Sequence, residues 1–199
     1  MRNLSEAKVY GGIGAILMLI GIFIPYGGPI VSIIGLVFIF IAVKAISEIT
    51  KDEDIFRNYL MHFIFTILTF VAIIVIMIIA FGAAGGFSWI TEITELQSED
   101  ITDFNTFWDL FGDMIVGAIV ALVVGWVLAI ISAMYLRKSY NSIAEHTKVS
   151  TFKTTGLIYL IGAITLIILI GFLILFIAKI IEIVAYFSIP ETLPSSKES

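Results

Sequence analysis

The sequence contains no cysteine and few charged residues: 14% of its 199 residues are Asp, Glu, Lys or Arg, and only two are histidine. Without cysteine, disulfide bonds and thiolate chemistry are excluded. The signatures of zinc proteases and serine hydrolases, HExxH and GxSxG, do not occur in the sequence. No basic patch is large enough to hold nucleic acid. We therefore expect a protein that is not an enzyme, that uses no cofactor or metal, and that binds no nucleic acid.

Long apolar runs make up most of the chain. Hydrophobic residues account for 60% of the sequence, and the mean hydropathy is +1.10, whereas a soluble domain is about 45–50% apolar. Runs of about 20 apolar residues can cross a bilayer, and backbone groups in lipid must be satisfied within the segment. The runs do not alternate between apolar and polar, which argues against an outer-membrane barrel. The sequence predicts an all-α, polytopic membrane helix bundle with five transmembrane helices, at residues 9–24, 30–45, 60–81, 114–135 and 156–178.

These helices belong to one predicted transmembrane domain, residues 1–189. Its longest connection, residues 82–113, carries seven acidic residues and no Lys or Arg. This connection lacks the spacing of an EF-hand, so we interpret it as a solvated acidic loop. Its stretch SWITEITELQSED is typical of a short amphipathic helix. Residues 190–199 are mostly polar and predict a disordered C-terminal tail.

Lys and Arg are concentrated in alternate connections. Nine of them lie before residue 9 or within the segments 44–59 and 137–153, and two follow residue 178. Cytoplasmic loops of membrane proteins carry the excess of basic residues. With five helices, this pattern places the N-terminus in the cytoplasm. It places the acidic loop 82–113 and the C-terminus outside the cell membrane.

A short polar phrase occurs twice, each time after an apolar run. It reads ISEITK at residues 46–51 and IAEHTK at residues 143–148. Both copies fall on the predicted cytoplasmic side, between an inward-running and an outward-running helix. We interpret helices 2–3 and 4–5 of the five as a parallel repeat of one hairpin, as in one class of transporters. The alternative is similar chemistry at the membrane surface without common ancestry.

The two phrases and the residues after them are candidates for contact with a cytoplasmic partner. In the first copy, Thr50 and Glu53 have the spacing of a capping box, which predicts that Thr50 begins the next helix. The alternative to a binding site is therefore an ordinary helix start at the membrane surface. The candidate contacts are Glu48, Thr50, Lys51, Arg57, Glu145, Thr147, Lys148 and Lys153.

Small residues recur at every fourth position in the fourth predicted helix, at Gly117, Ala121 and Gly125. Such a face lets two helix backbones approach closely. We expect it to pack within the monomer. The alternative partners are a second copy of the chain or another membrane protein.

Three stretches carry a resemblance to a known family. They are GGIGAILMLIG at residues 11–21, IFRNYL at 55–60 and AYFSIP at 185–190. They resemble a family of small archaeal multi-pass integral membrane proteins, a domain of unknown function, and the resemblance covers essentially the whole chain. It implies a multi-pass membrane protein and carries no activity, substrate or catalytic residue.

Away from their ends, where Lys44 and His62 lie, the five apolar runs contain no Asp, Glu, Lys, Arg or His. Lys179 and Glu182 follow the last run, and their spacing lets them pair on a helix. We expect this pair to be solvated at the outer interface, where it offers no route for protons. The function that fits best is a non-enzymatic membrane scaffold or accessory subunit. The alternative is a small-solute transporter or channel built from the repeated hairpin.

Overall fold

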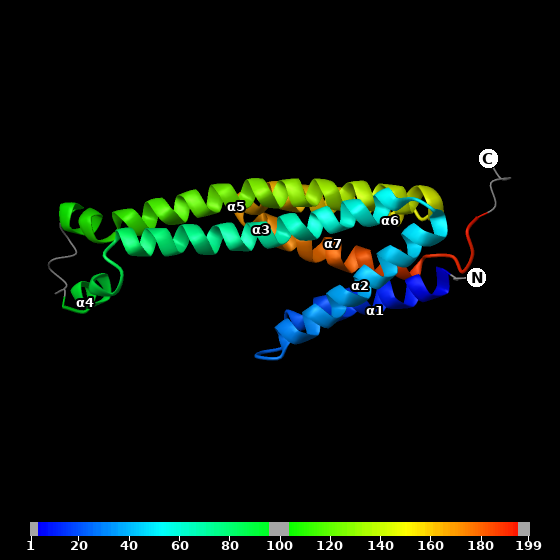
Figure 1. Cartoon of the computed structure of the whole chain (residues 1–199), viewed down its shortest axis with the longest axis horizontal. Coiled ribbons are helices and arrows are strands. Elements are labelled where there is room, and N and C mark those ends of the chain that lie inside the picture. The colour runs from blue at the N-terminus through cyan, green and yellow to red at the C-terminus, as the bar shows by residue number, and fades with distance from the viewer. Residues whose placement is uncertain (1–3, 96–103, 195–199) are drawn as a thin grey trace. The chain divides into compact units, whose positions relative to one another are not determined.

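The computed structural model describes residues 4–95 and 104–194, and this part of the chain contains helices and no strand (Figure 1). The first four long helices overlap the first four predicted ones. In chain order the elements are α1 (Leu4–Gly21), α2 (Gly28–Thr50), α3 (Glu53–Ala83), α4 (Phe87–Glu95), α5 (Phe104–Thr147), α6 (Thr151–Thr165), the 3-10 helix η2 (Leu166–Ile168) and α7 (Ile170–Phe187).

The chain divides into two compact units, and α3 and α5 each contribute to both. The core unit comprises Met1–Ile64 and Ile130–Ser199. The hairpin unit comprises Phe65–Ala129. In the hairpin unit, α4 confirms the predicted amphipathic helix in part, and the Trp89 indole donates a hydrogen bond to the Leu110 carbonyl over 2.5 Å. Residues 104–113 of the predicted acidic loop belong to α5 instead. Residues 96–103 of that loop lie outside the described residues, as do residues 195–199 of the predicted tail.

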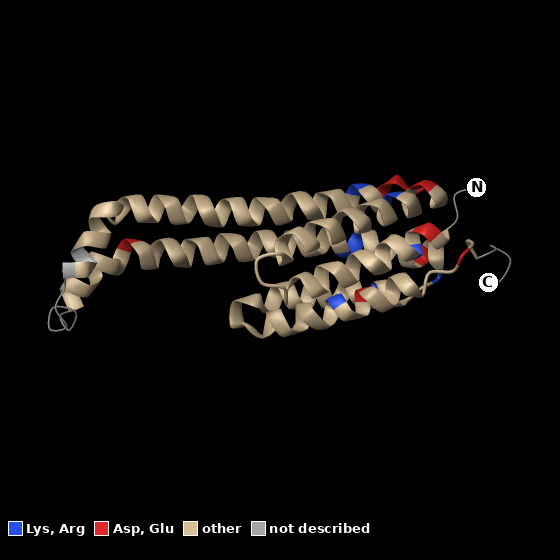
Figure 2. Cartoon of the chain, turned by 90° about the horizontal axis from the view of Figure 1, so that it is seen from below, with Lys and Arg blue, Asp and Glu red and all other residues tan. Residues whose placement is uncertain are grey.

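In the core unit, six helix termini meet around one apolar cluster. Each of these six helices contributes one fully buried side chain to the cluster. The side chain lies near the start of α1, α3 and α6, near the end of α2 and α5, and just after the end of α7. These side chains are Leu4, Ile55, Phe152, Ile46, Ile143 and Ile189. Most of the charged residues of the core unit gather toward this end (Figure 2). Therefore α1 begins, and α7 terminates, at the same end of the core unit.

The predicted single helix at residues 156–178 is wrong, because the structure divides this run into two helices that pack against each other. α6 ends at Thr165, the 3-10 turn follows, and Leu169 adopts the left-handed conformation with φ of 64° before α7 begins. At this turn Gly171 lies so close to Gly162 and Leu166 that a Cβ atom on Gly171 would clash with their backbone atoms. The turn contains no proline and no charged residue, so the sequence does not distinguish it from the rest of the apolar run.

This turn changes the number of candidate spans. Among the residues that the structure describes, six helices are long and apolar enough to cross a membrane, against five in the prediction. Residues 151–168 and 170–187 supply two of the six, each 18 residues long. The prediction that the two termini lie on opposite sides of the membrane rested on a single last helix, and it loses that basis.

Candidate functional site

The two polar phrases form two helix–helix corners of the same design. At the end of α2, the Thr50 hydroxyl donates to the Ile46 carbonyl over 2.8 Å, and Lys51 has φ of 57°. At the end of α5, the Thr147 hydroxyl donates to the Ile143 carbonyl over 2.7 Å, and Lys148 has φ of 59°. A left-handed residue commonly ends a helix, although it is usually glycine. Each corner thus turns the chain through a single left-handed lysine.

The predicted capping box is wrong. Thr50 lies in the last turn of α2, and its hydroxyl bonds back to that helix. The start of α3 is held instead by Asp52, whose carboxylate accepts the Asp54 backbone N–H over 3.0 Å. The reason is that α2 extends through Thr50, so α3 begins at Glu53, later than the capping box predicts.

The structure places six of the eight candidate contact residues on the surface of the corners. Thr147 is the clear exception, since it is 2% exposed and its hydroxyl is committed to α5. Thr50 is half-buried, and its hydroxyl likewise donates to a carbonyl of its own helix. Arg57 pairs with Asp54 over 2.7 Å, and Lys153 lies 3.5 Å from Glu145. The exposed candidates are Glu48, Lys51, Arg57, Glu145, Lys148 and Lys153.

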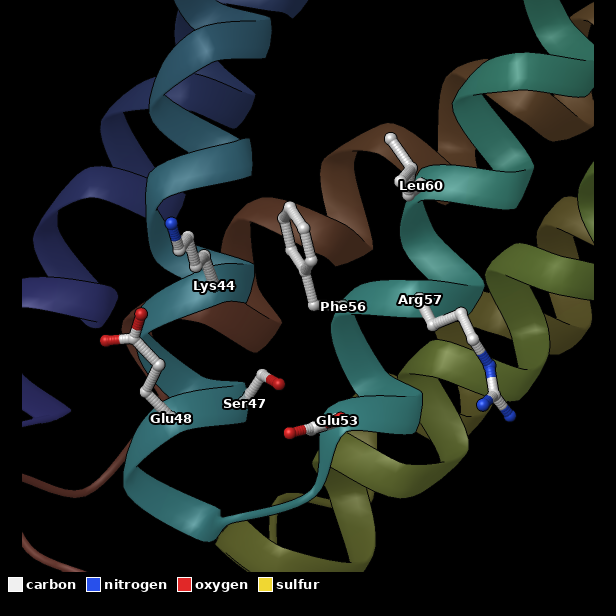
Figure 3. A pocket seen from close by; sticks show the side chains of 7 residues that line it. All are labelled: Lys44, Ser47, Glu48, Glu53, Phe56, Arg57 and Leu60. Carbon is white, nitrogen blue, oxygen red and sulfur yellow. The ribbon is translucent and has the colours of Figure 1, made fainter.

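Each corner contains an open pocket in the core unit, with a volume of about 300 Å³ in both cases. The pocket at the α2–α3 corner is lined by Lys44, Ser47, Glu48, Glu53, Phe56, Arg57 and Leu60. Figure 3 shows the Phe56 ring between α2 and α3, and Arg57 pointing away from α2. The pocket at the α5–α6 corner is lined by Arg137, Asn141, Glu145, Lys153, Thr154 and Leu157.

The small-residue face lies against α3 in the hairpin unit. A Cβ atom on Gly117 would overlap the Ala80 side chain, and one on Gly125 would meet Ile73 at 2.9 Å. Ala121, between them on α5, is 3% exposed. The three residues therefore stand where α5 approaches another helix of the same chain.

An ion pair is enclosed in the core unit, and sequence reasoning misplaced it. Glu182 is 2% exposed and Lys179 is 14% exposed, so the predicted solvated pair at an interface is wrong. The Lys179 ammonium donates to the Glu182 carboxylate over 2.9 Å. It also lies 3.6 Å from the Met18 sulfur of α1. The Tyr159 hydroxyl of α6 donates to the same carboxylate oxygen over 2.5 Å. The pair thus joins α1, α6 and α7.

Buried tyrosines stand beside this pair. Tyr186 is fully buried. Its ring packs edge-on against Phe152, whose ring packs in turn against Tyr140. Gly11 of α1 makes room for Tyr186, because a Cβ atom there would overlap the tyrosine ring. The resemblance motifs at residues 11–21 and 185–190 therefore meet in space, which the sequence alone did not indicate.

A second polar contact joins α3 and α5 in the core unit. The Ser132 hydroxyl lies 2.7 Å from His62 Nδ1 and donates to the His62 carbonyl over 2.9 Å. No group of three His, Asp or Glu side chains within residues 4–95 and 104–194 could hold a metal ion. The site residues thus form helix-to-helix contacts and two surface pockets.

The chain matches the family described as "Protein of unknown function (DUF996)" over residues 31–180. It is 33% identical over 193 residues to "Uncharacterized protein MJ1644" of Methanocaldococcus jannaschii, and the match covers 97% of each chain. No solved structure matches the chain. The predicted resemblance to a family of archaeal membrane proteins of unknown function is confirmed. With long apolar helices of the kind that cross membranes, the chain belongs to this DUF996 family of multi-pass membrane proteins.

Proposed function

We propose that the protein is a non-enzymatic membrane scaffold or accessory subunit that binds its partner through the two helix–helix corners. The supporting observation is their shared design at one end of the core unit. Glu48 and Glu145 are exposed at equivalent positions, and so are Lys51 and Lys148. Each corner rests on buried apolar residues and turns through one left-handed lysine. Two surfaces that each expose a glutamate and a lysine suit binding better than catalysis.

Six transmembrane spans, with both termini in the cytoplasm, belong to the same proposal. In this topology the connections 22–27, 84–103 and 166–169 face outward, and none contains Lys or Arg. Every basic residue except Lys179 then lies toward the cytoplasmic side, as the positive-inside bias requires. This distribution is more one-sided than the five-helix arrangement allowed. The repeated hairpins in this topology are α2–α3 and α5–α6.

The proposed partner is another membrane protein that presents a charged cytoplasmic segment. Each corner exposes a glutamate and a lysine close together, so the partner should carry both signs of charge. Rim charges of this kind govern the association rate and the choice of partner more than the affinity. A second copy of the chain is the alternative partner.

The test is purification of the full chain from its native membrane in a mild detergent. A stoichiometric protein partner is expected, and reversing the corner charges with E48K and E145K together should release it. The matched control is D109K, a reversal at an exposed acidic residue near the start of α5, far along the helix from the corners. A preparation without a partner, and with a single copy of the chain, would contradict the proposal.

A small-solute transporter or channel is the second candidate, and one observation favours it. Ionisable groups inside a membrane mark functional pathways by default, and Glu182 is such a group. Protein reconstituted in sealed liposomes would be given a pH gradient and a panel of small solutes. Uptake that disappears in Glu182→Gln and persists in the surface control Glu145→Gln would support transport in place of the scaffold.

A further inference from the structure

The two corner pockets are built from equivalent positions of the two polar phrases. When residue 46 is aligned with residue 143, five lining residues of one pocket fall on five of the other. The equivalent pairs are Lys44 and Asn141, Glu48 and Glu145, Phe56 and Lys153, Arg57 and Thr154, and Leu60 and Leu157. Differences between the two pockets can therefore be compared position by position.

The main difference is that aromatic residues in the α2–α3 corner are replaced in the α5–α6 corner. In the first corner the Phe40 ring packs against Phe56 and Tyr59, with centroid distances of 6.2 and 5.1 Å. The equivalent positions in the second corner hold Arg137, Lys153 and Gly156. Two aromatic rings are thus exchanged for two cations, and the third for a glycine.

The glycine places one of these cations. A Cβ atom on Gly156 would lie 3.0 Å from Arg137 Cα and 3.3 Å from its Cγ. The stem of Arg137 therefore lies against the backbone of α6, and Arg137 lines the pocket from α5. A larger residue at position 156 would displace it.

The basic side chains of the second pocket form weaker ion pairs than Arg57 forms in the first pocket. Arg57 in the first pocket pairs with Asp54 over 2.7 Å. Among the described residues, none forms an ion pair or hydrogen bond with the Arg137 guanidinium. Lys153 lies 3.5 Å from Glu145, but both side chains are more than half exposed, so this pair is weak. The pocket thus has one excess positive charge, and Asn141 and Thr154 add hydrogen-bond donors.

We propose that the α5–α6 pocket, lined by Arg137, Asn141, Lys153 and Thr154, binds the phosphate of an anionic lipid headgroup. Arg and Lys are the side chains that hold phosphate best, and Arg can do so with two parallel hydrogen bonds. Leu157 continues the pocket along α6 and is 41% exposed, so an acyl chain can lie beside it. The anionic lipids of the cytoplasmic leaflet are attracted to basic residues at this level of the membrane.

The α2–α3 pocket serves as the internal comparison. Its two basic and two acidic residues balance, and the Phe56 ring stands in it between the helices (Figure 3). We therefore expect it not to hold the same lipid. This inference rests on the proposed topology, which places the corners at the cytoplasmic side, and does not depend on the proposed scaffold role.

The test uses the purified full chain in detergent, with bound lipid detected by native mass spectrometry. Phosphatidylglycerol is the anionic probe, and phosphatidylcholine is the zwitterionic one. Phosphatidylglycerol should bind at least tenfold more tightly than phosphatidylcholine. The variant R137F/K153F, which gives the second corner the residues of the first, should lose this preference. The matched control K44A/R57A should keep it.

A second variant, R137Q/K153Q, guards against a folding defect, and both variants must keep the helix content and elution volume of the original chain. A preference that survives in the glutamine variant would overturn the proposal, as would an equal loss in K44A/R57A. Equal binding of the two lipids would also overturn it. If millimolar inorganic phosphate displaces the lipid completely, the pocket is a site for free phosphate and the lipid assignment is wrong.

Discussion

The Tyr159 hydroxyl donates a hydrogen bond to the Glu182 carboxylate over 2.5 Å, and this bond joins the two helices that the sequence had presented as one. The same carboxylate oxygen accepts a hydrogen bond from the Lys179 ammonium. A carboxylate with two such donors can be buried because its charge is paired and its lone pairs are used. The α6–α7 hairpin is thus closed by an apolar turn at one end and an ion pair nearer the other.

Removal of one partner of this ion pair should be far more damaging than removal of both. Glu182→Leu leaves the Lys179 ammonium enclosed without a counter-ion, and we expect it to lower the free energy of unfolding by about 3–5 kcal/mol. The double variant K179M/E182L removes both charges at similar volume and should recover most of that loss. Tyr159→Phe should lower the free energy by about 1.5–3 kcal/mol.

The measurement is unfolding in mild detergent titrated with a denaturing detergent, followed by helix circular dichroism. The surface variant Glu145→Gln serves as the control and should change little. Equal losses in Glu182→Leu and in the double variant would show that the pair is solvated after all.

The contact between Gly11 and Tyr186 gives a second prediction. A methyl group on Gly11 would overlap the Tyr186 ring, so Gly11→Ala should force α1 and α7 apart and lower the free energy of unfolding by about 1–3 kcal/mol. The matched control is Gly82→Ala in α3, because a Cβ atom there meets nothing within 4 Å. This control should raise stability by about 0.5–1 kcal/mol through helix propensity.

Both variants would be compared by the same detergent unfolding curve. If Gly11→Ala is as stable as the original chain, then α1 and α7 are not in close contact at this point.

Most of the fold could be predicted from hydropathy, because a lipid environment requires long helices and each long helix needs a long apolar run. The hairpin turn at residues 166–170 could not be predicted in this way. The turn consists of leucine and isoleucine residues, and Leu169 adopts the left-handed conformation. It contains no proline, asparagine or charged residue that would indicate a turn. Tertiary packing through Gly162 and Gly171 decides the turn, and packing partners are not visible in a single sequence.

The candidate site could also be predicted only in part, because packing partners are not visible in a single sequence. The two copies of the repeated phrase lie at two corners of similar geometry, since both Thr50 and Thr147 bond back to a helix and both following lysines are left-handed. The position of Glu182 could not be predicted, because its burial depends on α7 folding back beside α6. A single straight helix over this run instead predicts a solvated carboxylate.

The left-handed lysines at the corners give a third prediction. A residue with a Cβ atom in this conformation costs about 1–2 kcal/mol, whereas glycine adopts it freely. Lys51→Gly and Lys148→Gly should therefore each raise the free energy of unfolding by about 1 kcal/mol. Lys44→Gly is the matched control, because Lys44 lies inside α2, where glycine should lower stability by about 1 kcal/mol.

Thermal or detergent unfolding of the three variants would check this prediction. A loss of stability in both corner variants, of the size seen for Lys44→Gly, would contradict the left-handed geometry at the corners.

The last prediction concerns the topology of the chain and follows from the α6–α7 turn. The chain has no cysteine, so single cysteines can be introduced at exposed positions and probed with an impermeant thiol reagent on intact cells. Cysteine at Ser88 should react, since this residue lies on α4 in the connection without Lys or Arg. Cysteine at Glu6, Lys148 or Glu191 should react only after the membrane is made permeable, because six spans return the chain to the side on which it began. Reaction at residue 191 but not at residue 6 in intact cells would mean that α6 and α7 together cross the membrane only once. The termini would then lie on opposite sides, and the enclosed Lys179–Glu182 pair would need a different explanation.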